Sequence, residues 1–264
     1  MLRTFIRAAA PLSCCALIAA CSHGTDGPAN GGPPMTADTL KPAIIATIPH
    51  DSLAFTQGLI YHEGFLYEST GLYGHSSLRK VDAQTGEVLQ SIPLGGQYFG
   101  EGLALKGSRL VQLTWLEGRA FVYSLPALTP EDTFYYDGQG WGLAADSGRF
   151  IMSDGSENLY FRDDGFQVAG TVKVTRDGQP ISSLNELEYA NGYIYANIWY
   201  SNSILEINPQ SGQVNRVIDC SELAAIESPA DPRAVLNGIA YRPDRKTFYC
   251  TGKLWRNLFE IRLE

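Results

Sequence analysis

Five positions, one in each copy of a recurring phrase, carry side chains that could act on a ligand. The phrase GEGLAL at 100–105 has four counterparts along the chain, and its second residue differs between most copies. These second residues are Gln57, Glu101, Trp141, Asn185 and Asn237. A purely structural repeat would favour one apolar or constant residue, so a lone carboxylate among amides and an indole favours a binding or catalytic site.

A second set of matched positions lies thirteen residues after the third residue of each phrase. Its members are Gly71, Trp115, Gly155, Trp199 and, two residues later because of a longer turn, Lys253. Any one tryptophan alone would more often be a core residue. Three of the four tryptophans nevertheless fall on the two sets, beside one Glu and one Lys. Aromatic-lined hollows with a few convergent polar groups are typical of small-ligand pockets, so we expect both sets to meet in one.

The elements that carry these residues are short strands. Each phrase is followed by further runs rich in Val, Ile, Leu, Tyr and Phe, separated by Gly, Asp and Asn turns, and the phrases are 44, 40, 44 and 52 residues apart. Four antiparallel strands in about 40 residues form one blade of a β-propeller. The sequence therefore predicts an all-β, five-bladed propeller over 42–264.

The ring is expected to close with strands from both ends of the chain. The fifth copy reaches Glu264 after only three strands, and AIIATI at 43–48 supplies the fourth, which hides both sheet edges. The first strand of each blade should line the channel, where a glycine at the third position permits close backbone approach. In the fourth copy this residue is Glu186, and for Glu186 and Glu188 both packing and ion binding remain open.

The N-terminal 41 residues read as an export and tethering segment. Residues 1–21 have a basic start, a short apolar run and the ending LIAAC, which predicts a signal peptide with lipidation at Cys21; ordinary cleavage nearby is the alternative. The apolar run is too short to span a bilayer. Residues 22–41, rich in Gly and Pro, predict a flexible linker. We expect a periplasmic protein that is held at the outer membrane by lipid alone.

Charge and cysteine content narrow the function classes further. Beyond residue 21 the chain has 18 basic and 28 acidic residues, a formal charge of −10, without a basic cluster, which argues against nucleic-acid binding. Cys220 and Cys250 remain in the folded part, where a disulfide and two buried free thiols are equally open readings. We expect a monomer.

The ordered set of phrases resembles one enzyme family. FTQGL, YFGEGLAL, LTW, GWGL, LNELEY, ANIWYSN, LNGIA and TGKLW follow one another from about His50 to Leu263. In these phrases the chain resembles the glutaminyl cyclases, or glutamine cyclotransferases, of plants and bacteria. The resemblance implies a five-bladed propeller that converts an N-terminal glutamine of peptides or proteins into pyroglutamate with release of ammonia. It implies no catalytic metal or other cofactor, although a structural calcium or zinc ion remains open.

The chemistry of such a reaction suggests a role for each candidate residue. Glu101 would be the general base and then the general acid, and Lys253 and Asn185 would donate hydrogen bonds to the developing oxyanion. An ion pair of Glu101 with Lys253 that merely closes the channel is the structural alternative for Glu101. The expected substrate-binding residues are Gln57, Phe55, Trp115, Trp141, Trp199 and Asn237, the last of which could equally be structural.

Two other functions compete with the cyclase. A metal-dependent propeller lactonase needs at least three ligands converging on the ion, and none of the four histidines lies in either matched set. A non-catalytic propeller that binds peptide N-termini remains open, because a fold does not fix a function.

Overall fold

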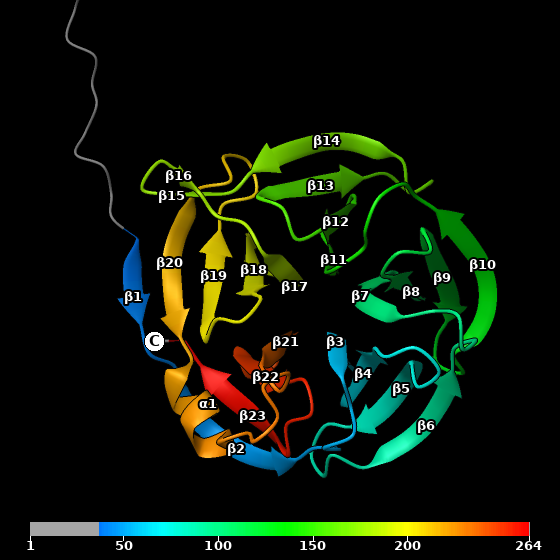
Figure 1. Cartoon of the computed structure of the whole chain (residues 1–264), viewed down its shortest axis with the longest axis horizontal. Coiled ribbons are helices and arrows are strands. Elements are labelled where there is room, and N and C mark those ends of the chain that lie inside the picture. Colours follow the sequence, from blue (N-terminus) through cyan, green and yellow to red (C-terminus); the bar gives the residue numbers. More distant parts are fainter. Residues whose placement is uncertain (1–36, 264) are drawn as a thin grey trace, which may run out of the picture. The chain divides into compact units, whose positions relative to one another are not determined.

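Five sheets surround a central channel in the computed structural model of the protein, which describes residues 37–263 (Figure 1). This arrangement confirms the predicted five-bladed propeller. The predicted signal peptide, the lipidation residue Cys21 and most of the predicted linker lie outside the described residues.

The first three blades follow one another in sequence, with the innermost strand first. Blade 1 comprises β3 (Thr56–His62), β4 (Phe65–Thr70), β5 (Ser77–Asp82) and β6 (Val88–Pro93). Blade 2 comprises β7 (Gly100–Lys106), β8 (Arg109–Thr114), β9 (Arg119–Ser124) and β10 (Thr129–Tyr135). Blade 3 comprises β11 (Leu143–Ala145), β12 (Phe150–Ser153), β13 (Asn158–Arg162) and β14 (Val168–Lys173).

The last two blades recruit strands from the N-terminal side. Blade 4 comprises β17 (Leu184–Ala190), β18 (Tyr193–Ile198), β19 (Ser203–Ile207) and β20 (Val214–Asp219), with β1 (Asp38–Leu40) parallel to β20. Blade 5 comprises β21 (Leu236–Arg242), β22 (Thr247–Gly252), β23 (Asn257–Arg262) and β2 (Ala43–Pro49). The pairing of β2 with β23 is the expected ring closure.

Three small elements were not predicted. Strand β1 lies inside the range predicted as a flexible linker, so that part of the domain boundary was wrong. The short run Asp38–Leu40 gains backbone hydrogen bonds at the outer edge of blade 4, which a reading of composition cannot foresee. A hairpin of β15 (Thr175–Arg176) and β16 (Gln179–Pro180) precedes blade 4, and helix α1 (Ser221–Glu227) follows it. No helix in residues 37–263 is long and apolar enough to cross a membrane.

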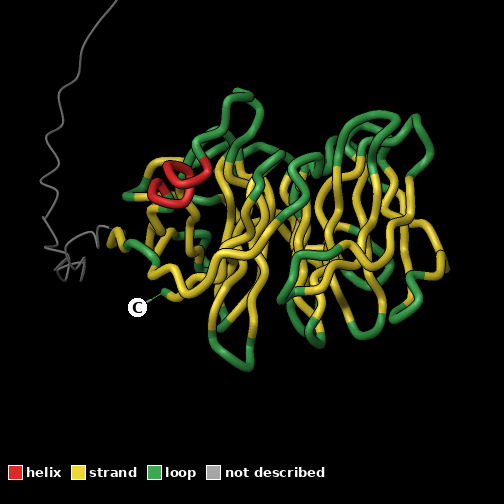
Figure 2. Tube along the Cα trace, turned by 90° about the horizontal axis from the view of Figure 1, so that it is seen from below, coloured by secondary structure: helices red, strands yellow, loops and turns green. Residues whose placement is uncertain are grey.

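The hydrophobic core consists of five clusters, one between each pair of neighbouring blades. For example, Leu103 and Leu110 of blade 2 pack with Tyr67 and Leu78 of blade 1. Side chains of a strand alternate between its two faces, so both faces of every blade can be buried in this way. Figure 2 shows the consequence from the side, with the strands between two layers of loops. Those loops are where a site can form on a rigid frame.

The innermost strands approach one another more closely than side chains would allow. A Cβ atom on Gly102 would lie 2.4 Å from the backbone nitrogen of Leu143, and one on Gly142 would lie 1.9 Å from the carbonyl oxygen of Asn185. This confirms the role expected of the third-position glycines. In blade 4 the carboxylate of Glu186 instead accepts hydrogen bonds from the backbone nitrogens of Leu59 and Ile239, at 3.2 and 2.9 Å. Glu186 therefore connects three blades across the channel.

The two cysteines of the propeller are buried free thiols in one core cluster. Cys220 precedes α1, and Cys250 lies in β22. Burial raises the pKa of Cys220 to about 12 and that of Cys250 well above its usual range. The sequence left open a disulfide or two free thiols, and in the structure Cys220 and Cys250 are free thiols.

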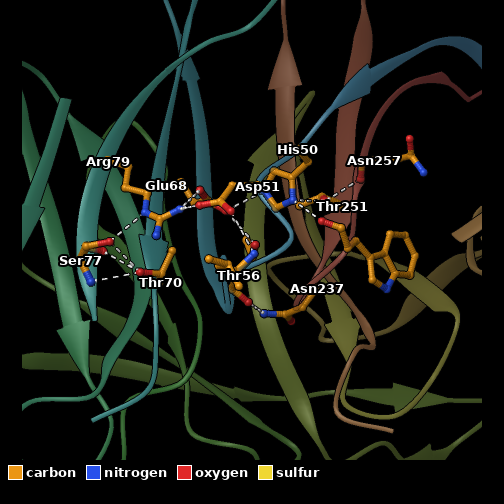
Figure 3. A network of polar contacts seen from close by, with 12 residues as sticks. His50, Asp51, Thr56, Glu68, Thr70, Ser77, Arg79, Asn237, Thr251 and Asn257 are labelled. Atoms are coloured by element: carbon orange, nitrogen blue, oxygen red, sulfur yellow. Dashed lines mark hydrogen bonds and ion pairs between the residues drawn. The ribbon is translucent and has the colours of Figure 1, made fainter. Parts of the chain in front are cut away.

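A buried ionic network secures the ring where its two ends meet (Figure 3). His50, just after β2, places Nε2 2.9 Å from Oε1 of Glu68 in blade 1. Its Nδ1 lies 2.8 Å from the carbonyl oxygen of Trp255 in the turn before β23. Thr56 donates to the same carboxylate at 2.7 Å, and Arg79 lies 3.9 Å from its second oxygen.

The partners of His50 require a doubly protonated ring. A carbonyl oxygen and a carboxylate both accept, so each ring nitrogen donates, as only an imidazolium can. Burial by itself would lower the pKa of His50, but Glu68 and, more weakly, Asp51 raise it above its usual value. The pKa of Glu68 would be raised by burial, but His50 and Arg79 bring it below the usual range. The closure is therefore a buried ion pair.

We predict that this closure weakens at alkaline pH. Because the pKa of His50 is higher in the folded protein, its stabilising contribution is complete below about pH 6.5 and is lost as the pH rises through the folded pKa. His50→Gln should lower the free energy of unfolding by about 3 kcal/mol at about pH 6, because it leaves Glu68 buried without its partner. The difference from the wild type should shrink at about pH 9.

Urea denaturation of both proteins at the two pH values measures this difference. His62→Gln is the matched control, since His62 is 35% exposed and its ring lies 3.8 Å from the exposed Glu63. If His50→Gln lowers the free energy of unfolding by the same amount at both pH values, His50 is not a charged partner of Glu68.

Candidate active site

The two sets of matched residues meet in one pocket of about 280 Å³. Its lining residues are Phe55, Gln57, Phe99, Glu101, Trp115, Trp141, Asn185, Trp199, Tyr200, Arg233 and Lys253. Of the residues predicted to form the site, only Asn237 does not line it. Residues from all five blades converge here. Except for Arg233, each of them lies on or just before the first strand of its blade, or just after the second strand.

A recurring backbone hydrogen bond sets this register. The nitrogen of Trp115 donates to the carbonyl oxygen of Phe99 at 2.9 Å, two residues before Glu101. The equivalent bonds join Gly71 to Phe55, Trp199 to Ser183, and Lys253 to Val235. The later position of Lys253, inferred from the longer turn, is thereby confirmed.

Two glycines of the second set leave room for rings of the pocket wall. A Cβ atom on Gly71 would lie 2.3 Å from the ring of Phe99, and one on Gly155 would lie 2.6 Å from the ring of Trp141. The second set thus combines side chains that line the pocket with glycines that leave space for neighbouring aromatic rings.

Glu101 is a buried carboxyl group with one side-chain partner. It is only 5% exposed, although the sequence placed it near the channel mouth, and its Oε1 accepts a hydrogen bond from Nε2 of Gln57 at 2.9 Å. Burial raises the pKa of Glu101 well above its usual range; the charge of Lys253 opposes this shift, and Glu117 adds to it. A carboxyl group whose pKa is raised in this way is better suited to take up and return a proton than an exposed one.

The side chains of Lys253 and Asn185 are buried donors without hydrogen-bond partners among the described residues, and the ammonium of Lys253 lies 5.1 Å from the ring centroid of Phe55. Both are less than 5% exposed, and neither the ammonium of Lys253 nor the amide of Asn185 has a hydrogen bond to another residue within 37–263. Burial lowers the pKa of Lys253 to about 8, against the effect of Glu101. No nitrogen–oxygen distance within 4.0 Å pairs Lys253 with Glu101. The ion pair considered as a structural alternative for Glu101 is therefore absent among the described residues.

Asn237 was predicted to bind substrate, but it does not line the pocket. Its side chain is fully buried and lies behind Gln57, to which its Nδ2 donates at 3.2 Å; it also donates to the carbonyl oxygen of Thr56 at 2.9 Å. Because Asn237 donates to Oε1 of Gln57, Nε2 of Gln57 is turned toward Glu101. The sequence placed Asn237 correctly on a first strand, but could not show that Gln57 would cover it.

Six of the eleven residues that line the pocket are aromatic. Phe55 packs edge-on against Phe99, with 6.2 Å between ring centroids, and Phe99 packs edge-on against Trp115 at 5.6 Å. Across the pocket Trp141 packs edge-on against Trp199 at 5.4 Å. Such a wall suits the methylene groups of a bound side chain, and it limits the access of water to Glu101.

Three lining residues were missed from the sequence. Phe99 stands two residues before Glu101, as Phe55 stands two before Gln57, so the repeat itself could have identified it. Tyr200 follows Trp199 in the left-handed region, with φ of 61°, and packs on its ring at 4.8 Å. Arg233 belongs to the loop between α1 and β21, which has no counterpart in other blades and so gave no signal.

The site offers a base, two donors and an apolar wall. No group of three or more His, Cys, Asp or Glu side chains that could hold a metal ion occurs within 37–263. The arrangement can accept a proton at Glu101 while Lys253 and Asn185 stabilise negative charge on an oxygen. These are the requirements for attack of a neutral amine on a carbonyl carbon.

Comparison with known proteins agrees with this geometry. The family model described as glutamine cyclotransferase matches residues 12–263. The chain is 42% identical to glutaminyl-peptide cyclotransferase of Arabidopsis thaliana over 226 residues, which is 84% of this chain and 71% of the relative. The crystal structure of glutaminyl cyclase from Myxococcus xanthus superposes with a TM-score of 0.82 at 44% identity, covering 86% of this chain and 98% of the other. The chain therefore belongs to the glutamine cyclotransferase family.

Proposed function

We propose that the protein is a glutaminyl-peptide cyclotransferase that converts an N-terminal glutamine into pyroglutamate and releases ammonia. The observation that carries this proposal is the buried carboxyl of Glu101, in one aromatic pocket with the unpartnered donors of Lys253 and Asn185. The family membership and the two relatives named above support it.

The reaction is an intramolecular aminolysis. The α-amino nitrogen of the glutamine attacks the carbon of its own side-chain amide, a new C–N bond closes a five-membered lactam, and the original C–N bond breaks to release ammonia. Nucleophile and electrophile belong to one residue, so the enzyme mainly has to hold the folded conformer. An α-amino group has an ordinary pKa of about 8, so a useful fraction is neutral near neutral pH.

Glu101 moves the proton in this scheme. Its carboxylate accepts a proton from the attacking amine and returns it to the departing nitrogen, which leaves as ammonia rather than as an amide anion. Efficient transfer needs a pKa near the working pH, and burial moves the pKa of Glu101 in that direction. Gln57 holds the carboxylate in place through its Nε2.

Lys253 and Asn185 stabilise the oxygen of the tetrahedral intermediate. Both residues are buried and, within residues 37–263, have no side-chain hydrogen bond to break, so little reorganisation is needed when charge develops. The aromatic walls hold the methylene groups of the glutamine. The proposed reaction uses no metal, because the three polar side chains supply both proton transfer and charge stabilisation.

The sequence of the N-terminal segment also suggests where the protein is located. We infer that Cys21 carries a lipid which holds an exported, monomeric enzyme at the periplasmic side of the outer membrane. The inference rests on the sequence LIAAC followed by Ser22. The substrates would then be exported peptides and proteins with a free N-terminal glutamine.

The function is tested by ammonia release from peptides with N-terminal glutamine in the presence of a chelator.

We predict that Glu101→Gln lowers kcat by about 10²–10⁴-fold, because the glutamine keeps an oxygen that can accept from Gln57 but cannot transfer a proton. The thermal midpoint should not fall, since burial disfavours the ionised form of Glu101 in the folded protein. A variant that is nearly fully active but less stable would make Glu101 a structural residue.

Controls separate this function from its competitors. A metal-dependent lactonase would lose activity with chelator, and a non-catalytic module would release no ammonia above the spontaneous rate. An N-acetylated glutamine peptide should not react, because its nitrogen is no longer a nucleophile.

A second prediction concerns the alkaline limb of the pH profile. The ammonium of Lys253 loses its proton as the pH rises through about 8, so the kcat of the wild type should fall there. In Lys253→Arg this limb should disappear, because a guanidinium remains charged to above about pH 12. Lys253→Met should lower kcat by about 10²–10³-fold at pH values below this limb, and its deficit relative to the wild type should shrink above it. An unchanged alkaline limb in Lys253→Arg would assign that limb to another group.

A third prediction concerns the lipid. Cys21→Ala should move the protein from the membrane fraction to the soluble periplasmic fraction, because the acylated residue is lost. Cys15→Ala is the matched control and should leave the protein with the membranes. Recovery of the wild type in the soluble fraction would refute lipidation.

A further inference from the structure

The aromatic wall of the pocket consists of two groups of rings with a break between them. Phe99 and Trp115 are in contact on one side, and Trp141 and Trp199 are in contact on the other. No ring contact among residues 37–263 joins Trp115 to Trp141. The break lies between blades 2 and 3, in the segment that leads from β10 to β11.

One side chain bridges this break. Oε1 of Gln139 accepts a hydrogen bond from Nε1 of Trp115 at 2.8 Å and another from Nε1 of Trp141 at 3.0 Å. An indole N–H can only donate, so both bonds must end on the amide oxygen, and this fixes the orientation of the Gln139 amide. A carbonyl oxygen has two lone pairs, one for each indole.

The backbone on either side holds Gln139 in place. Gly138 has a φ of 84°, which favours glycine, and the nitrogen of Gly140 donates to the carbonyl oxygen of Trp115 at 2.9 Å. A Cβ atom on Gly140 would lie 2.7 Å from the carbonyl oxygen of Thr114. The backbone of the segment is thus held against the end of β8, which places the side chain of Gln139 between the two indoles.

We propose that Gln139 is a positioning residue that sets the distance and orientation of Trp115 and Trp141, and so the width of the slot for the glutamine side chain. This inference rests on the proposed function. Walls that are ordered before the substrate arrives lose less side-chain entropy on binding. Gln139 lines the neighbouring cleft of about 970 Å³ rather than the pocket itself, so it acts through the two indoles.

Two substitutions separate the acceptor from the shape of the side chain. Gln139→Leu removes the acceptor, and Gln139→Glu keeps an oxygen at the same distance along the side chain. We expect Gln139→Leu to raise KM about tenfold, which corresponds to about 1.4 kcal/mol and to the net value of one or two hydrogen bonds. Its kcat should stay within about twofold, because Glu101, Lys253 and Asn185 are untouched. Gln139→Glu should restore a KM close to that of the wild type.

The matched control is Gln167→Leu. Gln167 is an exposed glutamine that lines the same cleft, and its side-chain amide donates only to the carbonyl oxygen of Gly165. This variant should keep the KM of the wild type. The thermal midpoints of all three variants should be close to that of the wild type, because both glutamines are exposed.

Near-ultraviolet circular dichroism adds a measurement that does not depend on turnover. Gln139→Leu should lose indole intensity, whereas Gln139→Glu and Gln167→Leu should not. The inference is overturned if Gln139→Leu keeps the KM and the dichroism of the wild type, or if the Leu and Glu variants raise KM equally. A wild type that releases no ammonia from glutamine peptides would refute the proposed function instead, and the dichroism would still decide the role of Gln139.

Discussion

The close approach of five strands around one channel is the constraint on which this structure depends. Backbone atoms of neighbouring blades fill the space that a side chain on Gly102 or Gly142 would need. At the fourth blade Glu186 provides the equivalent contact, because its carboxylate bridges backbone nitrogens of β3 and β21. Burial raises the pKa of Glu186 well above its usual range, and these two backbone donors oppose the shift. The ring is therefore tight at its axis.

The close approach of the innermost strands brings equivalent positions of the repeat together in one pocket. Equivalent positions of five blades come to the same height around the axis, so different residues at these positions meet in space although they lie 40 or more residues apart in the sequence. Glu101 has the only carboxylate among the first set, and Lys253 the only ammonium in the second. Burial shifts the pKa of each group toward neutrality, upward for the acid and downward for the amine. In the proposed mechanism the same pocket thereby supplies both a proton acceptor and a hydrogen-bond donor for the oxyanion.

Polar side chains that do not themselves line the pocket fix the orientation of residues that do. Asn237 turns the amide of Gln57 toward Glu101, and Gln139 joins Trp115 to Trp141. The network of His50 and Glu68 is connected to these contacts through Thr56. The hydroxyl group of Thr56 donates to Glu68, and the carbonyl oxygen of Thr56 accepts a hydrogen bond from Asn237. Ring closure and the position of Gln57 are thus connected by consecutive residues of β3.

The sequence by itself determined the blade count, the closure by β2 and most of the pocket, because a repeated unit places equivalent residues at equivalent points of a ring. Even the missed Phe99 follows from the same rule. Only the tertiary structure decided that Asn237 lies behind Gln57, that Glu101 and Lys253 are buried without a direct ion pair, and that β1 adds to blade 4. Those outcomes depend on which side chain covers which, and on contacts between segments far apart in the chain. Arg233 shows the same limit, since its loop occurs in one blade and no repeat predicts it.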